Sequence, residues 1–216
     1  MTYTGAVTPG GPPDVRELPD LTISKLSVGP MDNNAYLLRC RHTGDQVLID
    51  AANEPERLLD LIGPDGLSTV VTTHRHADHW QALAAVVDAT GAQSLAHEAD
   101  AGEIPVVTGT LRDGASVTVG ACQLEVIHLV GHTPGSIALL YRDPGGHPHL
   151  FTGDSLFPGG PGRTTNPQEF KSLMDDLEEK IFGRLPDDAW FYPGHGNDST
   201  LGKERPAIPE WRARGW

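Results

Sequence analysis

Four side chains that can bind a metal ion fall within six consecutive positions, in the sequence Thr73-His74-Arg75-His76-Ala77-Asp78-His79. This segment follows a predicted strand and precedes a predicted helix. In an extended chain, residues two apart point to the same side, so His74 and His76 can converge on one ion. Asp78 and His79 follow after the chain turns, where they can face a second ion beside the first. Imidazole and carboxylate together suit zinc, iron or manganese.

Further ligands must come from elsewhere in the chain, because a catalytic ion typically keeps three protein ligands and an open position. Three candidates each follow a predicted strand in a glycine-bearing turn: His132 in Gly131-His132-Thr133-Pro134-Gly135, Asp154 in Thr152-Gly153-Asp154, and His195 in Pro193-Gly194-His195-Gly196. Such turns place a side chain on a loop at one edge of a sheet. The absence of cysteine from these motifs argues against a closed structural zinc site. We therefore predict a catalytic metal centre.

The composition favours a globular protein that acts on small molecules. The chain has 216 residues, of which 38% are hydrophobic, enough for the core of one large or two small domains. Its net charge of -13 provides no positive surface for nucleic acid or an anionic membrane. The N-terminus lacks the features of a signal peptide, and no apolar run is long enough to cross a membrane. We expect a cytoplasmic protein.

The chain divides into a short arm and one domain. Residues 1–20 contain four of the 18 prolines and three of the 25 glycines, which predicts an extended N-terminal arm. Residues 21–216 form the predicted domain. Cys40 and Cys122 lie in apolar stretches and are expected to be buried free thiols.

Apolar, β-rich runs and helical periodicity alternate along the domain. The predicted strands are 21–28, 35–40, 46–50, 69–73, 116–119, 122–129, 136–141, 149–152 and 189–192. One helix is predicted after the cap sequence Asn53-Glu54-Pro55-Glu56, a second after the histidine cluster, and a third over Pro167 to Phe182 with Asn166 as its cap. This order is compatible with two packed sheets flanked by helices, although layer rules alone allow other α/β arrangements.

The ordered set of motifs resembles the metallo-β-lactamase superfamily, whose signature is HxHxDH followed by separate His, Asp and His ligands. The resemblance extends from Leu21 onward and implies an α/β fold, a four-layer αββα sandwich of two mixed β-sheets with outer helices. It also implies two divalent metal ions, with zinc as the expected metal and iron or manganese as alternatives. By position, one ion is held by His74, His76 and His132 and the other by Asp78, His79 and His195, with Asp154 bridging both.

This resemblance implies hydrolysis, since such a centre lowers the pKa of a bound water and stabilises the oxyanion that forms when hydroxide attacks a carbonyl. Asp78 could additionally act as a catalytic residue by orienting the nucleophile. Within the superfamily the chain looks most like the glyoxalase II group, which hydrolyses thioesters of glutathione and related thiols. Asp32-Asn33-Asn34-Ala35-Tyr36, the segment from Phe151 to Phe157 and the loop from Gly159 to Arg163 all resemble that group.

The substrate is expected to be a small-molecule thioester. Only 21 residues follow His195, too few for the helical C-terminal domain of full-length glyoxalase II enzymes, so the chain resembles their compact single-domain members. The thiol is then open, and mycothiol is one candidate. Arg163, in a glycine-rich loop, and Lys203 are candidate substrate-binding residues, with a solvated surface charge as the alternative for each.

Other functions remain as alternatives. An iron-dependent persulfide dioxygenase has the same fold and, by resemblance, would use His74, His132 and Asp154 on a single iron. Gly162-Arg163-Thr164 resembles the corresponding loop of that group, but Thr165 stands where an acidic residue is expected. A lactonase would use the same attacking hydroxide, and a metal-binding module without activity is the third alternative. The lack of an export signal disfavours a β-lactamase.

Overall fold

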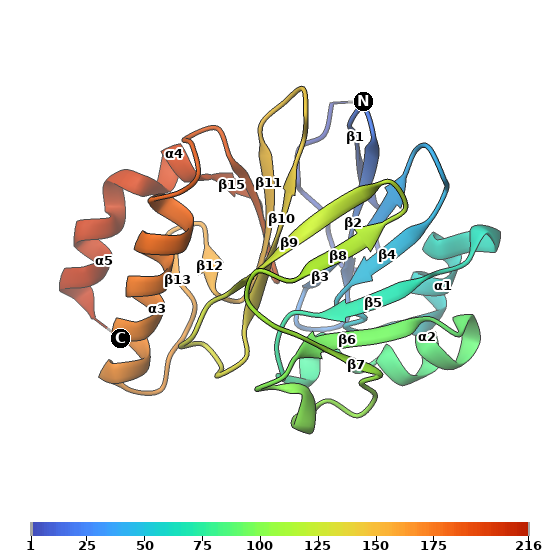
Figure 1. The fold of residues 1–216 in the computed structure, drawn as a ribbon, viewed down its shortest axis with the longest axis horizontal. Helices are drawn as coiled ribbons and strands as arrows, with labels where there is room; N and C mark the ends of the chain where they lie inside the picture. The colour runs from blue at the N-terminus through green and yellow to red at the C-terminus, as the bar shows by residue number, and fades with distance from the viewer. Residues whose placement is uncertain (1, 216) are drawn as a thin grey trace.

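Two mixed β-sheets form the centre of the molecule in the computed structural model, which describes residues 2–215 (Figure 1). Met1 and Trp216, the outermost residues of the expected arm and domain, lie outside the described residues. The first sheet runs in the order β1-β2-β3-β4-β5-β6-β7. Its strands are β1 (Asp14–Glu17), β2 (Leu21–Val28), β3 (Asn33–Cys40), β4 (Gln46–Ile49), β5 (Thr69–Thr72), β6 (Gln93–His97) and β7 (Gly109–Leu111).

The second sheet runs in the order β15-β14-β11-β10-β9-β8. Its strands are β8 (Ser116–Val119), β9 (Cys122–His128), β10 (Ile137–Arg142), β11 (Pro148–Gly153), β14 (Trp190–Pro193) and β15 (Ser199–Thr200). The two-residue strands β12 (Leu156–Phe157) and β13 (Gly160–Pro161) pair with each other. Each large sheet combines antiparallel and parallel pairs, so both are mixed.

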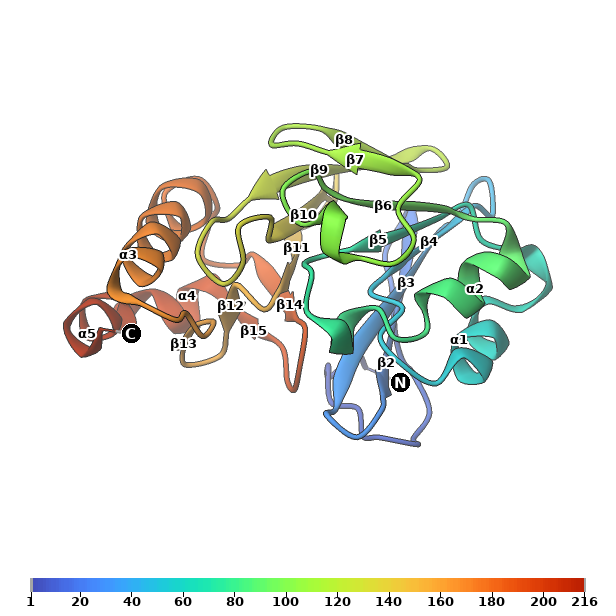
Figure 2. The ribbon, with the colours of Figure 1, turned by 90° about the horizontal axis from the view of Figure 1, so that it is seen from below.

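Helices cover the outer face of each sheet, which gives four layers (Figure 2). The α-helices are α1 (Pro55–Ile62), α2 (Leu83–Thr90), α3 (Pro167–Asp176), α4 (Leu201–Glu204) and α5 (Ile208–Arg214). The other helical turns are η1 (Gly63–Asp65), η2 (Ala77–His79), η3 (Ala101–Glu103), η4 (Leu177–Phe182) and η5 (Arg205–Ala207). The predicted αββα sandwich is confirmed. Within residues 2–215, no helix is long and apolar enough to cross a membrane.

Three apolar cores lie between the four layers, and strand alternation explains how one strand serves two of them. In β10, Ile137 and Leu139 point into the core between the two sheets, whereas Ala138 and Leu140 point into the core under α3. A third core joins α1 and α2 to the first sheet. Both cysteines are buried and free, as predicted, and they lie in the core between the sheets.

The helix over Pro167 to Phe182 is confirmed, together with its cap. Asn166 accepts a hydrogen bond from the backbone nitrogen of Glu169, and the last turn, η4, is a π-helix. The predicted cap of the first helix is wrong. Glu54 occupies the cap position in a left-handed conformation, and no side chain caps the helix; the Asn53 side chain instead accepts a hydrogen bond from the Glu54 nitrogen.

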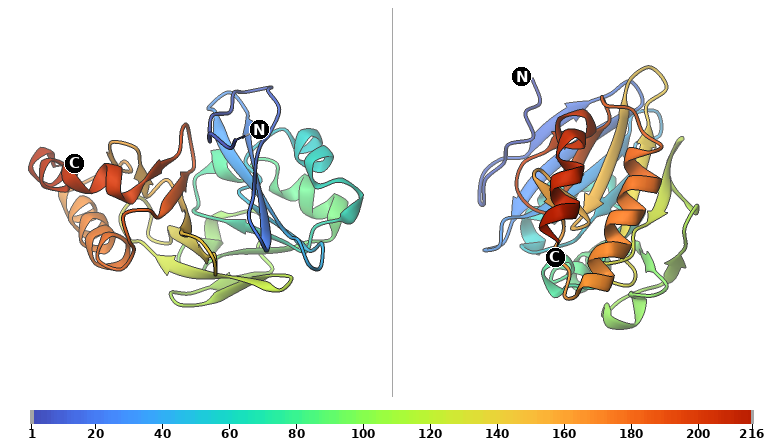
Figure 3. Two further views of the ribbon diagram at one scale, coloured as in Figure 1. Left: turned by 90° about the horizontal axis from the view of Figure 1, so that it is seen from above. Right: turned by 90° about the vertical axis from the view of Figure 1, so that its left-hand side faces the viewer.

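The N-terminal segment packs along the first sheet rather than standing free of it (Figure 3, left). Asp14–Glu17 forms β1, which pairs antiparallel with β2. This strand precedes the expected start of the domain at Leu21, and it has no alternating apolar pattern that would reveal it. The division into an arm and a domain stays a prediction, but the described part of the arm is in contact with the sheet.

Candidate metal centre

The seven predicted ligands come from loops that leave the ends of the central strands. His74 and His76 follow β5, and Asp78 and His79 lie in η2. The other three follow strands of the second sheet: His132 after β9, Asp154 after β11 and His195 after β14. Because β11 and β14 are neighbouring parallel strands, their last residues lie at the same edge, with Gly153 paired to Pro193. The structure brings all seven side chains together.

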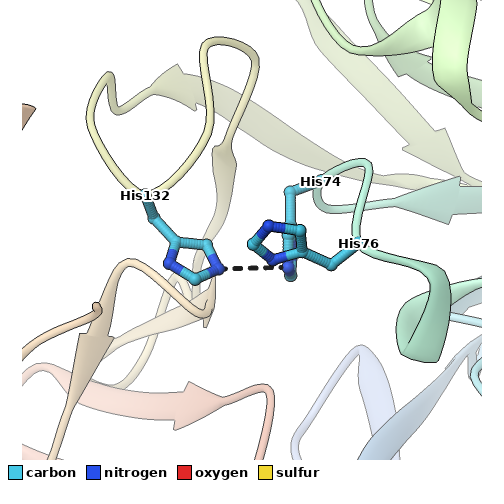
Figure 4. Close-up of side chains that lie close together, drawn as sticks. All are labelled: His74, His76 and His132. Carbon is cyan, nitrogen blue, oxygen red and sulfur yellow. Dashed lines mark hydrogen bonds between the residues drawn. The ribbon is translucent and has the colours of Figure 1, made fainter. Parts of the chain in front are cut away.

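His74, His76 and His132, here called the first triad, point toward a common centre (Figure 4). Each offers a ring nitrogen, and these atoms lie within 4.8 Å of one another. The Nε2 atoms of His74 and His132 are 3.3 Å apart. In a tetrahedral site with metal–nitrogen bonds of about 2.0–2.1 Å, neighbouring ligand atoms lie roughly 3.3 Å apart, so this spacing fits a metal ion.

The positions of the protons on the imidazole rings of the first triad also favour binding of a cation. His132 Nδ1 donates to the Arg163 carbonyl at 2.7 Å. His74 Nδ1 lies 3.0 Å from Thr73 Oγ1, whose own proton goes to Asp50, so the Nδ1 of His74 carries the donated proton. Burial lowers the pKa of both imidazoles, which keeps them neutral. Their two Nε2 lone pairs therefore face each other, an arrangement that a metal ion between them stabilises.

Asp78, His79 and His195 form the second triad, whose ligand atoms also lie within 4.8 Å of one another. Asp78 Oδ2 is 3.3 Å from the Nε2 atoms of both histidines, and those two nitrogens are 3.3 Å apart. His79 is fully buried, and its Nδ1 hydrogen-bonds to Asp50 Oδ2 at 2.8 Å. His195 Nδ1 donates to the Met31 carbonyl at 3.0 Å. These partners aim both Nε2 atoms at the centre of the triad.

Asp154 lies between the two triads. Its Oδ2 is 3.7 Å from His132 Nε2 and 3.4 Å from His195 Nε2, and its Oδ1 is 3.4 Å from His79 Nε2. Oδ1 is buried, and no donor in residues 2–215 makes a hydrogen bond of normal geometry to it. An orphaned carboxylate oxygen facing imidazole nitrogens is the expected state of a ligand that bridges two cations. The donor chemistry therefore fits two metal ions.

The pKa directions agree that this site attracts positive charge. Burial acts to raise the pKa of Asp154, but the imidazoles of His195 and His79 next to it hold that pKa well below its usual range. Burial acts to lower the pKa of His79, yet Asp50 and Asp154 outweigh it and raise the pKa to about 10. A proton can thus occupy the position between His79 and Asp154 that a metal would take.

Glycine beside the centre makes room for the ligands. A Cβ on Gly194 would overlap Asp154 Oδ1 and lie 2.8 Å from His79 Cε1. A Cβ on Gly162 would overlap the Asp154 carbonyl oxygen. No side chain fits at either position without displacing Asp154, which accounts for the glycines in the two loops.

Two supporting residues were missed by sequence reasoning. Asp50 follows β4 with φ of 58°, and its carboxylate accepts hydrogen bonds from His79 and from the backbone and hydroxyl of Thr73. Asn33 is buried, and its Nδ2 donates to Asp78 Oδ2 at 2.8 Å. Asp50 could have been identified from the sequence, because it is a polar residue at the end of a predicted buried strand that precedes the ligand-bearing strand.

The two candidate substrate-binding residues, Arg163 and Lys203, differ in their position relative to the metal centre. The Arg163 backbone carbonyl accepts a hydrogen bond from His132, and the residue is exposed. Lys203 lies in α4, and among the described residues no hydrogen bond or ion pair joins its side chain to the seven ligands. A role in substrate binding stays a prediction for both.

Comparison with known proteins agrees with this geometry. The family model of the metallo-beta-lactamase superfamily matches residues 28–195. A hydroxyacylglutathione hydrolase from Polaromonas sp. is 37% identical over 166 residues, which cover 76% of this chain and 62% of that protein. The hydroxyacylglutathione hydrolase GloC of Haemophilus influenzae is 30% identical over 184 residues, covering 75% of this chain and 85% of the relative.

Among solved structures, TTHA1623 in a di-iron-bound form is similar, with a TM-score of 0.70 and 32% identity over 84% of this chain and 96% of that one. The matched region spans about three-fifths of the length of several of the curated relatives that it matches. The family match includes the histidine cluster and every other predicted ligand, from the end of strand β2 to His195. The chain belongs to the metallo-beta-lactamase superfamily.

Proposed function

We propose that this protein is a metal-dependent hydrolase that cleaves the thioester of a small thiol. The observation that carries the proposal is the convergence of two complete triads on a shared carboxylate, Asp154. Two such ligand sets next to each other suit hydrolysis, because two metal ions held by them would supply both a nucleophile and a Lewis acid at the same place. The names of the relatives support the thioester as the substrate class.

The proposed cofactor is a pair of divalent ions, with zinc as the expected metal. The donor set of imidazole and carboxylate without thiolate suits zinc, iron and manganese alike. Iron is the main alternative, since the similar TTHA1623 structure is di-iron-bound. Held by the two triads and Asp154, such ions would supply a hydroxide nucleophile near neutral pH and positive charge for the oxyanion.

The residues of the chain then position the reactants. Asp78 is proposed to orient the nucleophile, and Asn33 holds that carboxylate by donating to its Oδ2. Water adds to the carbonyl carbon, the carbon–sulfur bond breaks, and the thiolate leaves and takes up a proton. Arg163 and Lys203 are the proposed contacts for the charged part of the substrate. The products are a carboxylic acid and the free thiol.

The identity of the thiol is part of the proposal. Several of the curated relatives, such as the Polaromonas enzyme, extend well beyond the matched region, whereas GloC is covered over 85% of its length. We propose that this chain acts like such compact relatives and accepts a range of acyl thiols, including an acyl conjugate of mycothiol.

One experiment tests the reaction and its cofactor together. Protein purified without added metal is analysed for its elements, and the same sample is assayed with S-lactoyl and S-formyl conjugates of glutathione and of mycothiol. Two ions per chain with release of free thiol are expected. Metal-loaded protein that cleaves none of these thioesters would overturn the proposal.

The second candidate, an iron-dependent persulfide dioxygenase, is favoured by one subset of the same geometry. His74, His132 and Asp154 alone form a compact three-ligand site, with Asp154 Oδ2 at 4.0 Å and 3.7 Å from the two imidazole Nε2 atoms. One iron per chain and oxygen consumption with a thiol persulfide would establish this candidate instead. The second triad, which it leaves unused, favours the hydrolase.

A further inference from the structure

A buried lysine connects the N-terminal segment to the loop that carries His195. Lys25 lies in β2 and is fully buried. Its Nζ donates to the carbonyl of Gly5 at 2.7 Å, to the carbonyl of Gly196 at 2.7 Å and to Asp198 Oδ1 at 2.6 Å. An ammonium group has three donor protons, so these contacts use all of them.

The partner of this lysine is equally enclosed. The Asp198 side chain is fully buried, and its Oδ2 accepts hydrogen bonds from Tyr3 Oη at 2.6 Å and Trp190 Nε1 at 3.0 Å. Tyr3 belongs to the N-terminal segment and Trp190 to β14. The ion pair is therefore surrounded by groups from three distant parts of the chain.

The contact with Gly196 reaches the metal centre. Gly196 directly follows His195, and its carbonyl accepts a second hydrogen bond from Asn34 Nδ2 at 2.9 Å. On the other side of His195, the Gly194 carbonyl accepts from the Asn34 nitrogen at 2.7 Å. The backbone on both sides of His195 is thus held, and Lys25 is the charged member of that support.

Stability alone is a weak reason for such a pair. Taking two charges out of water costs about as much as their attraction returns, and apolar replacements of buried ion pairs are often as stable. An ammonium with three fixed acceptors does supply geometry: two of its hydrogen bonds end on the loop after His195, at Gly196 and Asp198, and the third ties that loop to Gly5 of the N-terminal segment. The structure therefore favours a positioning role over a purely stabilising one.

We propose that Lys25 and Asp198, together with Gly5 and Tyr3 of the N-terminal segment, position His195 and so set the metal affinity of the second triad. The inference rests on the proposed metal centre. It makes residues 2–5 part of the support of that centre, although they lie far from it in sequence. Lys25 acts through the loop backbone and is a positioning residue.

The test is a double variant, Lys25→Met with Asp198→Asn, in the full-length chain. It removes both charges together, so that no unpaired buried charge is left, and the amide oxygen of the new side chain still accepts from Tyr3 and Trp190. Metal ions per chain, the affinity for each ion by competition with a chelating dye, and the absorption spectrum of the cobalt-substituted protein are measured beside thermal unfolding.

We expect the ion of the first triad to be retained and the affinity for the second ion to fall roughly 10–100-fold, the usual range for groups that orient metal ligands. The cobalt spectrum should change as the geometry at His195 loosens. Arg57→Met is the matched control: Arg57 also binds the N-terminal segment, at the Gly11 carbonyl, but it contacts the chain near Ser27 and Glu54 instead of the His195 loop.

The inference would be overturned if the double variant bound each ion with the same affinity as the wild type. It would also be overturned if the double variant lost both ions to the same extent. If the double variant does not fold, Tyr3→Phe decides, because it removes only one hydrogen bond to Asp198; an unchanged second-ion affinity in that variant would also overturn it. Wild-type protein that binds no metal would overturn the proposed function itself, which separates the two failures.

Discussion

The two triads are held by the fold in different ways. Each side chain of the second triad has its own hydrogen-bond partner, supplied by Asp50, Asn33 and the Met31 carbonyl. In the first triad His76 is exposed, and among residues 2–215 no group hydrogen-bonds to its ring. Because restrained ligands lose less freedom when they bind a metal, the second triad is expected to bind its ion more tightly.

The first triad is supported mainly through its loops. Asp100 is buried, and its carboxylate accepts hydrogen bonds from the Arg75 nitrogen, the Thr133 hydroxyl and the Gly135 nitrogen. These contacts join the loop after β5 to the loop that contains His132. Asp50 and Asp100 are thus two buried carboxylates that both hold ligand-bearing loops in place. Only Asp50 also hydrogen-bonds to the ring of a ligand.

The largest effect on metal content and activity is expected from a change at Asp154, because this carboxylate lies between the two triads. Asp154→Asn removes the charge shared by both ions, and metal content should fall at both triads, with activity reduced by more than about 100-fold, beyond the range of outer-shell changes. Elemental analysis and thioester turnover measure it, and a thermal unfolding curve controls for folding. A variant that keeps two ions at wild-type affinity would contradict the bridging position.

A smaller and one-sided effect is expected from Asp50→Asn. Asparagine tolerates the left-handed backbone at this position, so the change acts on the hydrogen bond to His79 rather than on the turn. Affinity for the ion of the second triad should fall roughly 10–100-fold, and by more than that of the first triad, which Asp50 supports only indirectly, through Thr73 and His74. Chelator competition with cobalt-substituted protein resolves the two ions. Equal weakening of both would mean that Asp50 supports the whole centre.

Asp100→Asn is the matched change for the first triad. Since Asp100 holds loops and no ligand ring, the affinity of the first triad should fall by about tenfold or less, at the low end of the range for supporting groups. The same competition experiment measures it. If the second ion were the one released, the assignment of Asp100 to the first triad would be wrong.

The smallest effect is expected from Arg163→Ala. The substitution keeps the backbone carbonyl that accepts from His132, so metal content should not change. KM should rise about fivefold, which corresponds to roughly 1 kcal/mol for an exposed charged contact. Arg142→Ala, which removes an exposed arginine paired with Glu125, is the control. An unchanged KM would leave the substrate contact on the first-triad side to other residues.

The strands and the seven candidate ligands could be predicted from local patterns in the sequence, whereas the four layers and the grouping of the ligands were implied by the resemblance to the metallo-β-lactamase superfamily. Leu21–Val28 and Ser116–Val119 are rich in β-branched and apolar residues, and the observed strands have the predicted bounds. The candidate ligands occupy short motifs in which the residue types themselves are distinctive. Asn166, with Pro167 after it, likewise specifies a helix start within four residues, and its cap forms as predicted.

What could not be predicted depends on contacts between distant residues. β1 is short and partly exposed, and only its pairing with β2 makes it a strand. Lys25 looks like an ordinary polar strand residue until the fold brings it to the loop at Gly196, and the motif that contains Asn33 gives no sign of its contact with Asp78. Asn53 resembles a helix cap, but the left-handed Glu54 moves the helix start beyond its reach.

The parallel pairing of β11 and β14 fixes the distance between the two loops that carry Asp154 and His195. Asp154 and His195 are the first residues beyond the Gly153 and Pro193 pair, apart from one intervening glycine, and neighbouring strands lie about 4.8 Å apart. The interval between these two ligands is therefore set by backbone pairing, including the hydrogen bond that the Gly194 nitrogen donates to the Gly153 carbonyl at 2.8 Å. Substitutions on the solvent-facing side of the outer helices leave this interval unchanged, and with it the spacing of the backbone that carries Asp154 and His195.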